Sequence, residues 1–123
     1  LGDKYAFRFL GDPNHYDYYN HINEARLSSL TIITSLSETM GLAMMESWSS
    51  GIPSISHPKI HMHGINYQTG IITSKTIEDY ASAIEEVMNN KRLLDDMSQG
   101  SRKFILDEFS SDAVVQKYIN IID

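Results

Sequence analysis

The segment that most constrains the fold is an apolar run that opens through a short polar loop into a helix. Residues 30–34 (Leu-Thr-Ile-Ile-Thr) are apolar or β-branched, as expected of a strand covered on both faces. A Ser-rich loop with Glu38 and Gly41 follows, and after it comes a helix-like segment that ends at Gly51. Because parallel strands are joined through helical crossovers, this order predicts an α/β fold.

The rest of the chain continues the alternation of strand and helix. We expect strands near residues 5–10, 30–34, 52–56 and 70–73, and helices over 16–29, 41–50, 76–89, 91–108 and 111–122. The predicted fold is therefore α/β, with a Rossmann-like, mostly parallel sheet of about four strands and helices on both faces. Residues 1–123 are expected to form a single domain. The open edge of this sheet is a candidate surface for a dimer.

Helical spacing also predicts which side chains pack inside and where helices end. In the helix over 41–50 we expect Leu42, Met45 and Trp48 to face the core, and Gly51 to close the helix. In the helix over 76–89, capped by Ser74 or Thr76, the expected inner face comprises Ile77, Tyr80, Ala81, Ile84, Val87 and Met88. Leu27 is a further candidate for packing, at the end of the helix over 16–29.

Composition excludes several classes of protein. The chain has 10 basic and 16 acidic residues and a formal net charge of −6, which argues against non-specific nucleic-acid binding. It has no cysteine, and no apolar run approaches the roughly 20 residues of a membrane span. The N-terminus lacks the features of a signal peptide, so we expect a cytoplasmic protein. Because the first residue is Leu1, we also expect a processed chain or part of a longer one.

Two carboxylates flank the glycine of the polar loop. Glu38 and Glu46 are eight positions apart, with Gly41 between them, where parallel sheets place their ligands. A carboxylate can accept two hydrogen bonds from a vicinal diol such as that of ribose. The N–H groups around Gly41 and Leu42 would meet a diphosphate at the helix N-terminus. The alternative is that Gly41 only serves the turn and Glu46 is solvated.

Three histidines follow the strand over 52–56. His61 and His63 would point the same way on a strand, and His57 could join them from a turn. Neutral imidazoles are common metal ligands. No nearby Asp, Glu or Cys completes a ligand set, so we favour packing of the loop, or contacts at the edge of a ligand site, over a metal site.

Residues 35–56 resemble the signature of a known enzyme family. The segment has a Ser-rich strand end, Glu38, a turn with Gly41, Glu46, and then Gly51-Ile52-Pro53 before a strand. This order is similar to that of retaining GT-B glycosyltransferases of the sucrose-synthase and glycogen-synthase-like group, the glycosyl transferases group 1. The likeness continues at residues 7–11, 69–72 and 109–110, so it covers nearly the whole chain.

The resemblance implies a role for each residue of the loop and helix. Glu38 would lie beside the donor sugar as the catalytic position, and Glu46 would hold the ribose of the nucleotide. The segment Thr39-Met40-Gly41-Leu42 would meet the diphosphate and the sugar. The resemblance further implies a nucleotide-sugar donor, no metal and no cofactor. The intact enzyme would transfer a hexosyl group to an acceptor hydroxyl, with retention, in polysaccharide or glycoconjugate biosynthesis.

The family pattern also has parts that we expect to lie outside this chain. In the family, the donor domain begins with strands that carry an Arg and a Lys for the diphosphate, and an acceptor-binding domain precedes it. We therefore expect a partial GT-B C-terminal domain, inactive alone, from an intact enzyme that is a candidate for peripheral membrane association. Two alternatives stay open: a non-catalytic α/β interaction module, and a sugar epimerase relative with GT-B architecture.

Overall fold

The sheet is parallel and small. The computed structural model describes residues 23, 26–60, 69–72 and 75–122. Within them, β1 (Thr31–Ile33), β2 (Ser54–Ser56) and β3 (Gly70–Ile72) form one sheet in the order β1-β2-β3. Ile32 pairs with Ile55, and Ile55 with Ile71, both in parallel register. Three of the expected strands and their parallel pairing are confirmed, while the expected strand over 5–10 lies outside the described residues.

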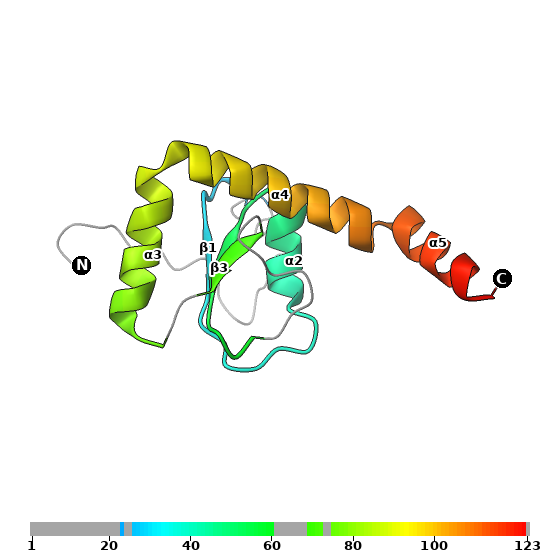
Figure 1. Cartoon of the computed structure of the whole chain (residues 1–123), viewed down its shortest axis with the longest axis horizontal. Coiled ribbons are helices and arrows are strands. Elements are labelled where there is room, and N and C mark those ends of the chain that lie inside the picture. The colour runs from blue at the N-terminus through cyan, green and yellow to red at the C-terminus, as the bar shows by residue number, and fades with distance from the viewer. Residues whose placement is uncertain (1–22, 24–25, 61–68, 73–74, 123) are drawn as a thin grey trace.

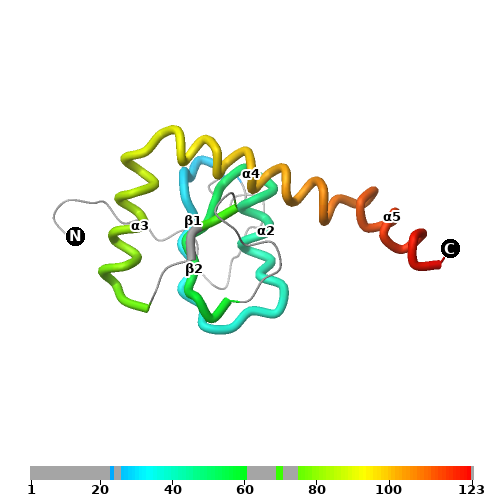
Figure 2. The backbone as a smooth tube through the Cα atoms, in the orientation of Figure 1, coloured from blue at the N-terminus to red at the C-terminus, as the bar shows by residue number. Residues whose placement is uncertain are grey.

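Helices cover both faces of this sheet. The described elements include the helices α2 (Leu42–Ser49), α3 (Ile77–Asn89), α4 (Lys91–Phe109) and α5 (Ser111–Ile122), of which α2 and α3 flank the strands. Figure 1 shows α2 and α3 on opposite sides of the strands, and α4 crossing the end of the sheet that lies away from the cyan loop between β1 and α2. The backbone trace follows α4 onward into α5, which extends away from the other elements (Figure 2). The expected helices over 41–50, 76–89, 91–108 and 111–122 are confirmed within one or two residues, while the expected helix over 16–29 lies mostly outside the described residues.

The core has two parts, both of which involve α4. In the first, Met44 and Trp48 of α2 pack with Ile60, and Ile33, Phe104 and Ile105 lie against them. The rings of Trp48 and Phe104 meet edge to face, with centroids 5.8 Å apart. In the second, Val87 of α3 packs with Leu93 and Met97 of α4, joined by Leu30 and Leu94. The long helix α4 therefore links the helices on the two faces of the sheet.

Sequence signals for helix ends are borne out at two places. Thr76 caps α3 in a capping box, in which its side chain accepts from the Asp79 N–H and the Asp79 carboxylate accepts from the Thr76 N–H. Gly51, with φ of 75°, follows α2, and its N–H donates to the Trp48 carbonyl at 2.9 Å. The Ile52 N–H donates to the Ser47 carbonyl at 2.9 Å, which completes a Schellman motif.

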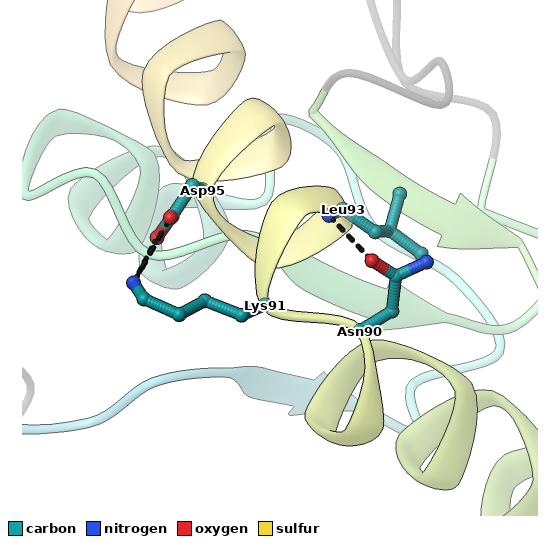
Figure 3. A network of polar contacts seen from close by, with 4 residues as sticks. All are labelled: Asn90, Lys91, Leu93 and Asp95. Atoms are coloured by element: carbon teal, nitrogen blue, oxygen red, sulfur yellow. Dashed lines mark hydrogen bonds and ion pairs between the residues drawn. The ribbon is translucent and has the colours of Figure 1, made fainter.

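The junction between α3 and α4 is a single residue. The Asn90 side chain accepts from the Leu93 N–H at 3.0 Å, and Lys91 pairs with Asp95 one turn further on (Figure 3). Asn90 thus caps α4 immediately after α3 has ended. This short connection allows α4 to cross the end of the sheet and to reach α2.

Several predicted packing positions are wrong. Leu42 is 63% exposed, because α2 turns Met44, Ser47 and Trp48 inward and Leu42 lies about 200° around the helix from Met44. Met45 is only half-buried. On α3 the buried positions are Ala83 and Val87, so the predicted core residues Ile77 and Met88 lie off the inner face and are exposed.

The prediction that the first described strand is covered on both faces is also wrong. β1 is at one edge of the described sheet, and Ile32 on it is 46% exposed, whereas Ile55 on the central strand β2 is fully buried. Leu27, expected to pack, lies in a turn before β1 and is exposed. The periodicity of an apolar run indicates a strand, but the neighbours of that strand decide how many of its faces are covered.

Candidate functional site

The candidate site begins where the loop after β1 enters α2. Gly41 is the N-cap of α2 and is buried, with a left-handed backbone (φ 58°, ψ 50°) that suits glycine. The N–H groups of Met44 and Met45 donate to its carbonyl at 2.9 and 3.0 Å. No side chain caps α2. The side chains of Met40 and Leu42, on either side of Gly41 in the chain, are exposed.

The two carboxylates lie before and within α2. Glu38 is exposed in the loop, together with Thr39 and Met40, whereas Glu46 is half-buried in the second turn of the helix. The chain therefore brings a loop carboxylate, an uncapped helix N-terminus and a helix carboxylate into one strand–loop–helix unit. The donor-binding and catalytic roles of these residues and of Gly41 and Leu42 stay predictions.

Tyr80 joins α3 to the carboxyl end of β1. Its hydroxyl donates to the Ile33 carbonyl at 3.0 Å, and the side chain is half-buried. The sequence indicated Tyr80 only as a packing residue of α3. The contact spans 47 positions along the chain, and no local pattern predicts it. It anchors the strand end from which the Glu38 loop departs.

A tight turn closes the carboxyl end of β2. The Ile60 N–H donates to the His57 carbonyl at 3.0 Å, with Pro58 at the second position of the turn. His57 is buried, and its Nδ1 accepts from the Lys59 N–H at 3.1 Å. In this conformation the His57 Nδ1 atom is therefore occupied by a hydrogen bond within the turn. Within the part of the chain that the structure describes, no three His, Cys, Asp or Glu side chains are grouped to hold a metal ion, and His61 and His63 lie outside it.

Directional contacts from the sheet hold α2 in place. The Trp48 Nε1–H donates to the Ser54 hydroxyl of β2 at 3.1 Å. The Thr31 hydroxyl of β1 donates to the Ser47 hydroxyl at 3.0 Å, and the Ser47 hydroxyl donates to the Ala43 carbonyl at 2.9 Å. No local sequence pattern indicates the Thr31–Ser47 contact, because the two residues are 16 positions apart on different elements.

The other end of α2 is held by α4. The Ser98 hydroxyl donates to the Gly51 carbonyl, and the Arg102 guanidinium donates to the Ser49 carbonyl at 3.0 Å. Both contacts satisfy carbonyls at or just after the helix C-terminus, and the Arg102 charge complements the negative end of the helix dipole. With its C-terminal end held against α4, α2 presents its N-terminus at the opposite end of the sheet (Figure 1).

Comparison with known proteins identifies the family. A family model described as glycosyl transferases group 1 matches residues 4–104. The match includes the three strands, α2, α3 and most of α4, and therefore the whole candidate site, whereas α5 follows it. A search of curated proteins found no match. Because the match covers most of the sequence, the chain belongs to the glycosyl transferases group 1 family.

Proposed function

We propose that this chain binds the nucleotide-sugar donor of a glycosyl transfer reaction at the N-terminus of α2. The observation that carries the proposal is the uncapped, left-handed Gly41 at the head of α2, between Glu38 and Glu46, within the residues that match the family. The same match favours glycosyl transfer over an interaction module or a sugar epimerase.

The arrangement supports a division of roles along the donor. The N–H groups of the first turn of α2, at Gly41 and Leu42, would bind the diphosphate, with Thr39 and Met40 beside it. These donors would also stabilise the charge that develops on the diphosphate as it leaves the sugar. Glu46 would accept hydrogen bonds from the ribose diol, and Glu38 in the exposed loop would lie beside the sugar.

The finer features of the reaction belong to the same proposal. The transferred group would be a hexose, the anomeric configuration would be retained, and neither a metal nor a cofactor would take part. The acceptor hydroxyl would come from a glycan or glycoconjugate, held by a separate acceptor-binding domain. Two domains are needed because the reaction requires donor and acceptor in near-attack geometry.

Other expectations also stay predictions. They are the single domain over residues 1–123, the GT-B architecture, the cytoplasmic location, the dimer through the sheet edge and the peripheral membrane association. No helix in the described part of the chain is long and apolar enough to cross a lipid bilayer.

Titration with nucleotides tests the proposal. We expect UDP or GDP to shift the NMR amide signals of Gly41 and Leu42, with a Kd of about 1 mM, because the net charge of −6 opposes anion binding. Glu46→Gln should weaken the binding about tenfold, since a hydrogen bond to a charged group contributes about 1.5–3 kcal/mol. Added EDTA should leave the affinity unchanged.

Glu85→Gln is the matched control. Glu85 is an exposed carboxylate on α3, so its substitution removes the same charge away from the site and should leave the Kd unchanged. An interaction module would show no nucleotide-dependent shifts at all. Equal weakening by both substitutions would show that net charge, rather than a contact with Glu46, governs the binding.

A further inference from the structure

We propose that Thr31 is a positioning residue, which sets the direction in which Glu46 points into the donor site. The inference rests on the proposed function, since it gives Glu46 the ribose as its partner. Its starting observation is the relay in which the Thr31 hydroxyl donates to the Ser47 hydroxyl at 3.0 Å, and the Ser47 hydroxyl donates to the Ala43 carbonyl at 2.9 Å. Ser47 is buried and directly follows Glu46 in the chain.

The Thr31–Ser47–Ala43 relay restricts rotation of α2 about its own axis, which apolar packing alone leaves less constrained. Met44 and Trp48 hold α2 in the core, but burial of apolar surface is non-directional. A hydrogen bond is directional, so the Thr31–Ser47 bond opposes rotation of α2 about its own axis. The Trp48–Ser54 bond does the same one position later on the helix. Thr31 therefore anchors α2 to β1, and Ser54 anchors it to β2.

Rotation of α2 would affect the two parts of the donor site unequally. A turn of about 10° moves a side-chain group about 6 Å from the helix axis by about 1 Å, but moves backbone atoms, at about 2 Å, by less than about 0.4 Å. The N–H groups that would meet the diphosphate belong to the backbone, whereas the Glu46 carboxylate lies at the end of a side chain. Loss of the relay should therefore impair binding of the ribose and leave binding of the diphosphate nearly unchanged.

The test compares a ribonucleotide with its 2′-deoxy form. We expect the wild-type chain to bind UDP about fivefold to tenfold more tightly than 2′-deoxy-UDP, because a lost hydrogen bond to a charged group has at least this effect. In Thr31→Val, which keeps the shape of the side chain and suits a strand, the ratio should fall toward 1 while the Kd of 2′-deoxy-UDP stays the same. Thr31→Ser keeps the hydroxyl and should restore the ratio. In a Glu46→Gln background, Thr31→Val should have no further effect.

Each outcome has a separate meaning. If the wild-type chain binds UDP and 2′-deoxy-UDP with equal Kd, Glu46 does not bind the ribose, and both the proposed role of Glu46 and the inference about Thr31 are wrong. A wild-type chain that prefers UDP, together with a Thr31→Val variant that keeps the full preference, overturns the inference alone. Equal weakening of both nucleotides in Thr31→Val would also overturn it, since Thr31 would then only stabilise the fold. If Thr31→Val does not fold, Ser47→Ala removes the same contact from the helix side and must lower the ratio.

Discussion

Gly41 is the single residue on which the geometry of the candidate site depends most directly. Its left-handed backbone (φ 58°) turns the chain from the Glu38 loop into α2, and among the described residues every positive φ belongs to glycine. An L-residue in this conformation costs about 1–2 kcal/mol. We therefore expect Gly41→Ala to lower the free energy of unfolding by about that amount in urea denaturation.

Gly41→Asn is the informative control at this position. Asn tolerates the left-handed region better than Ala, because its short polar side chain can hydrogen-bond locally. The Asn variant should therefore be the more stable of the two, although its side chain is larger. Equal stability of Gly41→Ala and the wild type would mean that the turn can adopt an ordinary backbone and that Gly41 is not required there.

At the scale of elements, the attachment of α2 to β2 depends on one buried polar pair. The Trp48 Nε1–H donates to the Ser54 hydroxyl at 3.1 Å, and both residues are at most 1% exposed. Ser54→Ala would leave the Trp48 N–H buried without this partner, at a cost of about 1–3 kcal/mol. Trp48→Phe would leave the Ser54 hydroxyl without its donor and would also create a cavity, at a cost of about 2–4 kcal/mol.

A double-mutant cycle separates the hydrogen bond from the packing. In the double variant neither orphaned polar group remains, so its destabilisation should be smaller than the sum of the single effects by about 1 kcal/mol. Thermal or urea unfolding of the four proteins measures this coupling. Additive effects would indicate that the Trp48–Ser54 hydrogen bond does not help to hold α2 against the sheet. The argument that the Thr31–Ser47 hydrogen bond orients α2 would then be weaker, because both bonds join α2 to the sheet in the same way.

At the scale of the whole molecule, the packed core ends within α4. Met97 of α4 is fully buried, whereas α5 has no buried residue and leaves the apolar side chains of Tyr118, Ile121 and Ile122 more than half-exposed. Lys117 connects α5 to the end of α4 through an ion pair with Glu108. Met97→Ala should therefore cost about 2–5 kcal/mol, and Ile122→Ala no more than about 0.5 kcal/mol, in equilibrium unfolding.

The two variants form a matched pair, because both remove apolar atoms from a helix to leave alanine. A loss above about 1 kcal/mol for Ile122→Ala would mean that α5 is covered in solution, and dependence of that loss on protein concentration would identify another copy of the chain as the cover. The extent of the family match, which ends at residue 104, agrees with a core that ends in α4.

The sequence by itself determined the order of the elements and the way they end. Alternation of short apolar runs with helical periods predicted the parallel strands, because crossovers leave few other topologies. Thr76 and Gly51 marked helix ends because capping depends on residues within one turn. The unit of Glu38, Gly41 and Glu46 indicated the family for the same reason, since its residues are close in sequence.

Only the tertiary structure decided which faces are covered and what holds the site in place. Leu42 and Met44 both suit the apolar side of a helix, and the partners of α2 selected Met44. Ile32 on β1, at one edge of the described sheet, is partly exposed, whereas Ile55 on the central strand β2 is fully buried. The Thr31–Ser47 and Tyr80–Ile33 contacts join different elements. Local periodicity reports how a segment folds, but burial and long-range hydrogen bonds depend on neighbours that the chain supplies from distant positions.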